Sequence, residues 1–222
     1  NGWESVKEFS IIRDVIRVPT VDVKMPSPEI AQVRLFAFNE NAPRAVFNAL
    51  IEAVNEKQAQ GLILDLRNNP GGYLEIAVDL AGWFLDKDSV VATERFRSGD
   101  EIVFRTRGTG ALKDFPLVVL INGGSASASE ILAGALRDQL GTKLIGEKSF
   151  GKGSVQELQP LKDGSKLKIT VANWVLPKGQ IIDKIGLTPD VEVKLTEEDI
   201  KAEKDPQVAK AVEVLKKMLS NN

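Results

Sequence analysis

Short apolar runs and amphipathic segments alternate along much of the chain, which predicts strands that alternate with helices. Two continuous apolar runs have the length and composition of buried strands. Each run stops in a glycine-rich turn, and apolar residues at helical spacing follow each turn. In chain order the two units are 61–66, 67–72 and 74–85, and 115–121, 122–124 and 125–140.

Other segments add strands and helices around these two units. Alternating apolar and polar residues predict a strand at 32–38 and two hairpins. A helical pattern begins at Pro43, and Gly141 is expected to stop the helix that starts near Ser125. The pattern leaves open whether the C-terminal helix covers the core or pairs with another chain. The remaining predicted elements are short strands or irregular structure in 1–24, hairpins at 88–106 and 154–177, a strand at 143–145 and a helix at 206–220.

This order of elements indicates an α/β fold, and 222 residues suit one large domain or one domain with an appendage. Ligands in such folds gather where the C-terminal ends of strands meet the N-terminal ends of helices. The turns at 67–72 and 122–124 are therefore expected to lie together at a site.

Composition excludes several kinds of chemistry. The chain has no His and no Cys, which removes the Ser-His-Asp triad, a cysteine nucleophile and the usual zinc sites. The base for a nucleophile must then be a lysine, a carboxylate or a terminal amine. A formal net charge of -2 gives no overall attraction to nucleic acid or anionic membrane. No apolar run reaches the length of a membrane span.

Residues 125–130, Ser-Ala-Ser-Ala-Ser-Glu, are the first candidate site. A serine between a buried strand and a helix is exposed, and the free N–H groups of the helix could stabilise an oxyanion. However, Ser127 and Glu130 also form the capping-box pattern S-x-x-E. On this segment alone we favour the cap.

Residues 146–154, Gly-Glu-Lys-Ser-Phe-Gly-Lys-Gly-Ser, are the second candidate. They miss the phosphate-binding P-loop because Gly153 replaces Ser or Thr and a strand pattern follows. They also contain S-x-x-K, but the glycines disfavour the helical turn that this motif needs. Lys152 could instead turn inward as the base. A lysine base must be neutral, so we expect burial, with Phe150 and Val155 as walls.

The third candidate is the turn Arg67-Asn-Asn-Pro-Gly-Gly72. It is either a plain end to a strand or half of an oxyanion hole, since glycine lets the backbone approach a substrate closely.

Together these segments resemble the carboxy-terminal processing proteases, also called tail-specific proteases. The resemblance follows the family's order over nearly the whole chain and implies a fold related to ClpP and the crotonases, with additional hairpins. The matching stretches are 62–72, 125–134 and 146–156, with 9–16 and 186–190 in support.

The resemblance implies a Ser-Lys dyad. It makes Ser127 the nucleophile, Lys152 the base and Gln156 the residue that orients the lysine. Neutral Lys152 would take the Ser127 proton as the hydroxyl attacks a peptide carbonyl, and water would then hydrolyse the acyl-enzyme. No metal or cofactor is implied.

The resemblance also implies supporting groups. The oxyanion hole is placed at the backbone N–H of Ala128 and of Gly71 or Gly72. Asp138 matches an acidic position linked to activity in some members. Because its charge would favour a protonated lysine, we expect a structural role for Asp138, with Arg137.

Family members usually carry a PDZ domain, which binds the substrate's C-terminus. We expect residues 1–20 to be a remnant leading from a missing PDZ domain, 21–195 to be the protease core, and 196–222 to pack on the core or on a partner subunit. The resemblance further implies protein or peptide substrates with apolar C-terminal regions. It also implies an extracytoplasmic location, in the periplasm, cell envelope or thylakoid lumen. Whether the chain forms a homo-oligomer stays open.

Two other functions remain open from the sequence. A crotonase-like acyl-CoA enzyme would also use two N–H groups as an oxyanion hole, although such enzymes often place carboxylates where this chain has Ser127 and Lys152. An inactive or PDZ-dependent binding core would use the same motifs only as caps and turns.

Overall fold

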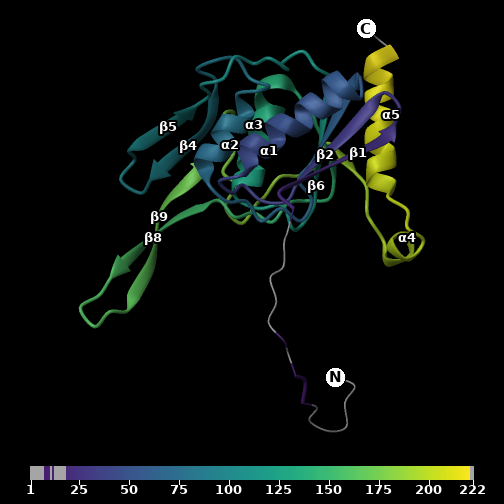
Figure 1. The fold of residues 1–222 in the computed structure, drawn as a ribbon. Coiled ribbons are helices and arrows are strands. Elements are labelled where there is room, and N and C mark those ends of the chain that lie inside the picture. The colour runs from purple at the N-terminus through teal and green to yellow at the C-terminus, as the bar shows by residue number, and fades with distance from the viewer. Residues whose placement is uncertain (1–7, 11, 13–18, 221–222) are drawn as a thin grey trace.

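The computed structural model describes residues 8–10, 12 and 19–220. It contains two sheets, and helices cover the larger one (Figure 1). The larger sheet has the order β1-β2-β3-β6-β7-β10, in which only β1 is antiparallel to its neighbour. Its strands are β1 (Val21–Ser27), β2 (Ile30–Leu35), β3 (Gly61–Asp65), β6 (Leu117–Ile121), β7 (Lys143–Gly146) and β10 (Val191–Glu192).

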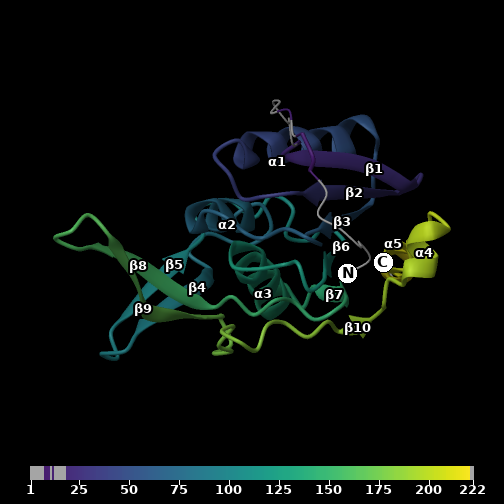
Figure 2. The same cartoon turned by 90° about the horizontal axis from the view of Figure 1, so that it is seen from below.

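The central strands β3 and β6 are buried along their whole length. This burial explains their unbroken apolar sequence, because helices cover both faces of the sheet. Helices α1 (Ala42–Ile51), α2 (Leu74–Ala81) and α3 (Ala128–Leu140) lie on one face, and α5 (Pro206–Ser220) lies on the other (Figure 2). The parallel core explains why the turns after β3 and β6 open at the same edge.

Helix α5 forms a second, smaller core with the far face of the sheet. Its Ala211 and Leu215 are fully buried against Ile30, Ile63 and neighbouring strand residues. Of the two roles that the sequence left open for this helix, the structure therefore shows the intramolecular one. The short helix α4 (Glu197–Lys201) precedes α5.

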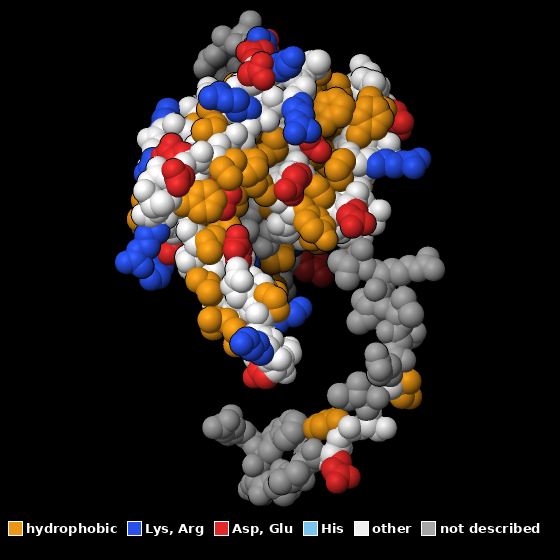
Figure 3. Space-filling model, turned by 90° about the vertical axis from the view of Figure 1, so that its left-hand side faces the viewer, with side chains coloured by type: hydrophobic (Ala, Val, Ile, Leu, Met, Phe, Trp, Pro, Cys, Tyr) orange, Lys and Arg blue, Asp and Glu red, His pale blue; other side chains and the backbone are white. Residues whose placement is uncertain are grey.

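The smaller sheet is antiparallel, with the order β5-β4-β9-β8. Its β8–β9 hairpin projects from the body as an arm, and hydrophobic side chains follow the arm in Figure 3. The exposed apolar residues of this arm are Leu158, Leu161, Leu167 and Ile169. The strands are β4 (Val90–Phe96), β5 (Glu101–Arg105), β8 (Ser154–Pro160) and β9 (Lys166–Val175).

The predicted mixed α/β fold and both hairpins are confirmed, with differences at several ends. Helix α3 starts at Ala128 and not near Ser125, because the Ser125 hydroxyl is bonded to Leu66, the residue after β3. Helix α1 continues into a π-helical turn, Glu52–Glu56, and β2 ends at Leu35. Most of the predicted remnant at 1–20 lies outside the described residues.

We expect a Leu215→Ala variant to lower the free energy of unfolding by about 2–5 kcal/mol, the usual cost of a cavity in a core. Urea unfolding followed by circular dichroism measures this change. Leu140→Ala is the matched control, because that side chain at the end of α3 is 42% exposed. Equal losses in the two variants would contradict a second core under α5.

Candidate active site

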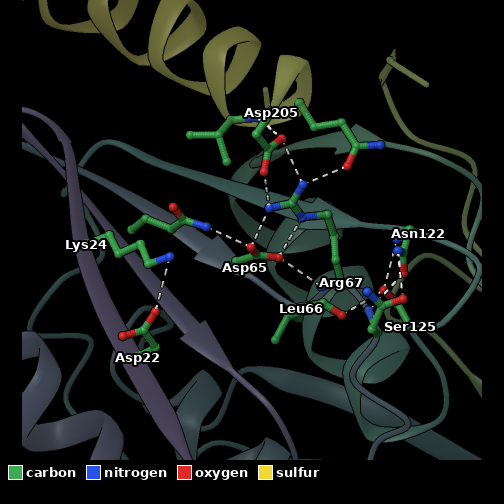
Figure 4. A network of polar contacts seen from close by, with 12 residues as sticks. Asp22, Lys24, Asp65, Leu66, Arg67, Asn122, Ser125 and Asp205 are labelled. Atoms are coloured by element: carbon green, nitrogen blue, oxygen red, sulfur yellow. Dashed lines mark hydrogen bonds and ion pairs between the residues drawn. The ribbon is translucent and has the colours of Figure 1, made fainter. Parts of the chain in front are cut away.

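The turn after β3 and the turn after β6 lie together, as the sequence predicted, and direct hydrogen bonds join them. The Asn122 side-chain oxygen accepts from Asn68 N–H at 2.8 Å, and its amide donates back to Asn68 Oδ1 at 3.0 Å. The Ser125 hydroxyl donates to the carbonyl of Leu66 at 2.8 Å (Figure 4). Residues from two distant parts of the chain thus form one edge.

Asn69 connects this edge to the start of α3. Its carbonyl accepts from Ala126 N–H at 3.0 Å and from the Ser129 hydroxyl at 2.9 Å. Its side chain donates to Leu35 O at 2.8 Å and accepts from Gly71 N–H at 2.9 Å. Because Ser127 lies between two residues that bind one carbonyl, its backbone is fixed from both sides.

Ser127 has an unusual backbone conformation, with φ 57° and ψ -118°. Positive φ is rare for a residue with a side chain and is found preferentially at functional sites. The predicted capping box is present but asymmetric. Ser127 N–H donates to Glu130 Oε2 at 2.9 Å, whereas its hydroxyl approaches the Glu130 N–H without a hydrogen bond of standard geometry. The hydroxyl is therefore not committed to capping.

Glu130 holds the serine segment and the lysine segment together. Its Oε2 also accepts from Lys152 N–H at 2.9 Å, and its Oε1 accepts from Gly151 N–H at 2.7 Å and from the Ser149 hydroxyl. The carboxylate is fully buried. One oxygen thus bridges the backbones of Ser127 and Lys152, which brings together two residues that are 25 positions apart in the sequence.

The Lys152 side chain is exposed, so the expected burial of this lysine is wrong for the structure described here. Its expected walls do not enclose it, since Phe150 is 66% exposed and Val155 is only partly buried. The flanking glycines have a backbone role. Gly151 has φ +88°, and a Cβ on Gly153 would overlap the backbone nitrogen of Asp183. These glycines let the segment pass close to residues 182–186.

The structure distinguishes the two glycines of the 67–72 turn. Gly71 touches the serine segment, because a Cβ added to it would lie 2.9 Å from Ser127 Cβ and from Ala128 N. Its own N–H is used by Asn69. The N–H groups of Gly72 and Ala128 have no hydrogen-bond partner among the described residues.

Among the described residues, neither Gln156 nor Asp138 is hydrogen-bonded to Ser127 or Lys152. Gln156 is exposed on β8, beside a bulge in its pairing with β9. Asp138 lies three turns along α3. Its carboxylate accepts from Arg137 Nε at 3.2 Å, which is the expected contact, and from Lys178 N–H at 3.1 Å.

Ser149 is buried and lies outside any helix, which agrees with the rejection of the S-x-x-K motif. The strand predicted after the near-miss P-loop is β8.

An ion pair that the sequence did not reveal lies beneath the turn. The Arg67 guanidinium donates to Asp65 from Nε at 2.9 Å and from Nη2 at 2.7 Å, and Gln32 donates to the same carboxylate. Burial opposes the charge on Arg67, but the hydrogen bonds from its carboxylate partners outweigh burial and raise the pKa of the guanidinium. Asp65 closes β3 and Arg67 opens the turn, so this pair fixes the direction in which the chain leaves the sheet.

Comparisons with known proteins show the family to which the chain belongs. The model of peptidase family S41 matches residues 29–193. A carboxyl-terminal-processing protease of Synechocystis sp. is 43% identical over 87% of this chain and 45% of its own length. The chloroplastic carboxyl-terminal-processing peptidase 3 of Arabidopsis thaliana is 39% identical over 86% of this chain and 38% of its own.

A solved structure is similar as well. The photosystem II D1 C-terminal processing protease superposes with a TM-score of 0.73 and 34% identity, over 81% of this chain and 49% of that one. The chain therefore spans less than half the length of these relatives.

Proposed function

Because the chain belongs to peptidase family S41, we propose that it is the core of a serine endopeptidase that cleaves protein substrates near their C-terminal ends. The observation that carries the proposal is the Glu130 carboxylate, since one of its oxygens accepts from both Ser127 N–H and Lys152 N–H. A nucleophile and a base must be held close together, and this carboxylate supports that arrangement.

In the proposed mechanism the Ser127 hydroxyl attacks the carbonyl carbon of the scissile peptide bond while neutral Lys152 accepts the hydroxyl proton. The tetrahedral intermediate collapses, the C–N bond breaks, and the leaving amine takes the proton from Lys152. Water then attacks the acyl-enzyme with Lys152 again as base, which releases the acid and restores Ser127. Because the Lys152 side chain is exposed, the mechanism requires the bound substrate to exclude water from it.

Ala128 N–H and Gly72 N–H are the proposed donors to the oxyanion. Both are without a partner among the described residues, and Ala128 is the first residue of α3, where the helix dipole favours negative charge. Gly71 N–H would have to leave Asn69 before it could serve, so its proposed part is close packing against Ser127. Gln156, on β8, is proposed to orient the lysine once a substrate is bound, and Asp138 to hold the end of α3 through Arg137.

Apolar peptide segments are the proposed substrates. Phe150 is exposed two residues before Lys152, and the exposed side chain of Leu158 follows on the β8–β9 arm. An extended apolar peptide passing the dyad would meet these side chains first. Neither the matched family nor the relatives described above support the acyl-CoA alternative.

An extracytoplasmic site of action is proposed from the relatives, one of which is chloroplastic and another of which processes a photosystem II protein. Within residues 19–220, no helix has the length and apolar character needed to cross a bilayer.

The proposal is tested by cleavage of an unstructured protein, with casein as the probe. We expect Ser127→Ala and Lys152→Ala each to lower the cleavage rate at least ~1,000-fold, the usual loss when a member of such a catalytic unit is removed. Lys148→Ala, which changes an exposed lysine four residues earlier, should cleave like the wild type.

A fluorophosphonate label followed by mass spectrometry gives a second measurement that does not depend on turnover. We expect the label on Ser127 and on no other serine. Equal cleavage by wild type, Ser127→Ala and Lys152→Ala would show that the activity belongs to another protein and would overturn the proposal.

A further inference from the structure

The C-terminal segment reaches the base of the candidate active site. Asp205, just before α5, and Gln207, in its first turn, both contact Arg67 (Figure 4). Arg67 Nη1 donates to Asp205 Oδ1 at 3.0 Å and to Gln207 Oε1 at 2.9 Å, and Nη2 lies 2.9 Å from Asp205 Oδ2. The contact between Arg67 and Asp205 spans 138 positions of sequence.

With these contacts the guanidinium has no spare donor. Nε and Nη2 bind Asp65, while Nη2 and Nη1 bind Asp205 and Nη1 also binds Gln207. A guanidinium has five N–H groups, so two carboxylates and one amide satisfy all of them. Residues from β3 and from the beginning of α5 therefore fix the position and the plane of the Arg67 guanidinium.

The charges make the Asp205 contact specific. Burial opposes ionisation of Asp205, but hydrogen bonds from Arg67 and from Val208 N–H outweigh it and hold the pKa of this carboxyl below its usual value. Arg67 is only 6% exposed, whereas the Asp205 side chain is 38% exposed, so this ion pair lies at the border between the core and the solvent. Removing the Asp205 charge leaves part of a buried guanidinium poorly paired, which favours a shift of the arginine.

A shift of Arg67 would be passed directly to Ser127. Arg67 is the first residue of the turn whose next residue, Asn68, is bonded to Asn122. Asn69, one residue further, holds the segment around Ser127 through its carbonyl. The path from Asp205 to the nucleophile thus consists of one ion pair, the backbone of Asn68 and Asn69, and the hydrogen bonds that the Asn69 carbonyl accepts on either side of Ser127.

We propose that Asp205 is a positioning residue for the reaction, which acts through Arg67 on the 67–72 turn. The proposal rests on the proposed peptidase function. Its predicted signature is a fall in kcat with little change in KM, because the turn carries the oxyanion donor and not the surface that binds the rest of the peptide.

Asp205→Asn is the decisive variant. Asparagine is as good a helix cap as aspartate, so the hydrogen bond from Val208 N–H, 3.0 Å in the wild type, can be kept while the charge is lost. We expect kcat for a fluorogenic peptide to fall about 10–100-fold with KM within about twofold, in line with the cost of a small misplacement. Hydrogen–deuterium exchange should rise in residues 67–72 and stay unchanged in the strands of the smaller sheet.

Asp199→Asn is the matched control. It makes the same chemical change in the same C-terminal segment, at the exposed capping box of α4, and should leave kcat and exchange as in the wild type. Asp205→Ser, which also retains a cap, is the second variant. Unfolding of both Asp205 variants would assign this residue to folding in general and overturn the proposal.

The two proposals fail in different ways. If cleavage does not depend on Ser127, the peptidase function is wrong, and the exchange of residues 67–72 still decides whether Asp205 controls the turn. If cleavage depends on Ser127 but Asp205→Asn retains the wild-type kcat, the positioning role is wrong and the peptidase function stands.

Discussion

A Glu130→Gln variant is expected to lose about 100-fold in peptide cleavage and about 3 kcal/mol in the free energy of unfolding. The change turns one buried carboxylate oxygen into an NH2 group, which must then face N–H or O–H donors from Ser127, Ser149, Gly151 or Lys152. Two donors cannot pair, so the serine and lysine segments should separate. Peptide cleavage and urea unfolding measure the two effects.

Glu75→Gln is the control for this change. Glu75 also lies in the first turn of a helix, α2, but its side chain is exposed. We expect normal cleavage and a change in unfolding free energy within about 0.5 kcal/mol, as for most surface substitutions. Wild-type cleavage by Glu130→Gln would show that the bridge between the two segments is dispensable.

A Gly71→Ala variant is expected to abolish measurable cleavage, with a loss of at least ~100-fold. The new Cβ would lie 2.6 Å from Ala126 O and 2.9 Å from both Ala128 N and Ser127 Cβ. Two of these three atoms belong to the backbone, so a side-chain rotation alone cannot relieve the contact. Either the turn or the start of α3 must move, and both belong to the candidate site.

Gly99→Ala is the control that distinguishes the steric clash at Gly71 from the cost of placing alanine at a positive φ. Gly99 has φ +95° against +94° for Gly71, but a Cβ there meets nothing within 4 Å. Both variants should lose similar stability from the strained φ, while only Gly71→Ala loses cleavage. If Gly99→Ala loses cleavage as well, strain and not contact with Ser127 would explain the effect.

The sequence predicted the elements of this fold well where apolar periodicity decides the structure. The runs at 61–66 and 115–121 became β3 and β6, and β8 and β9 form the hairpin predicted at 154–177. Predicted ends were less accurate where a side chain binds a distant backbone. The helix expected from near Ser125 begins three residues later, because Ser125 binds Leu66, and periodicity contains no information on such a contact.

The sequence singled out the segments that form the candidate site but not the contacts that join them. Glu130 fits a capping box, but that pattern does not show that its capping oxygen Oε2 also binds Lys152 N–H, or that Oε1 binds Gly151 N–H. The sequence pattern predicted an ordinary turn residue at Asn69, although Asn69 binds both Leu35 and the segment around Ser127. The expected burial of Lys152 was wrong because glycine freedom permits an inward turn without requiring one.

The long separation between Arg67 and Asp205 has a consequence for synthesis on the ribosome. A chain is made from its N-terminus at about 5–20 residues per second, so Asp205 follows Arg67 by roughly 7–28 s. During that interval β3, its turn and α3 can form, while the arginine still lacks the second carboxylate that completes its pairing. The growing chain would therefore contain Ser127 and Lys152, the proposed nucleophile and base, before the turn beside them is fixed, and this order would delay the proposed activity until α5 has docked.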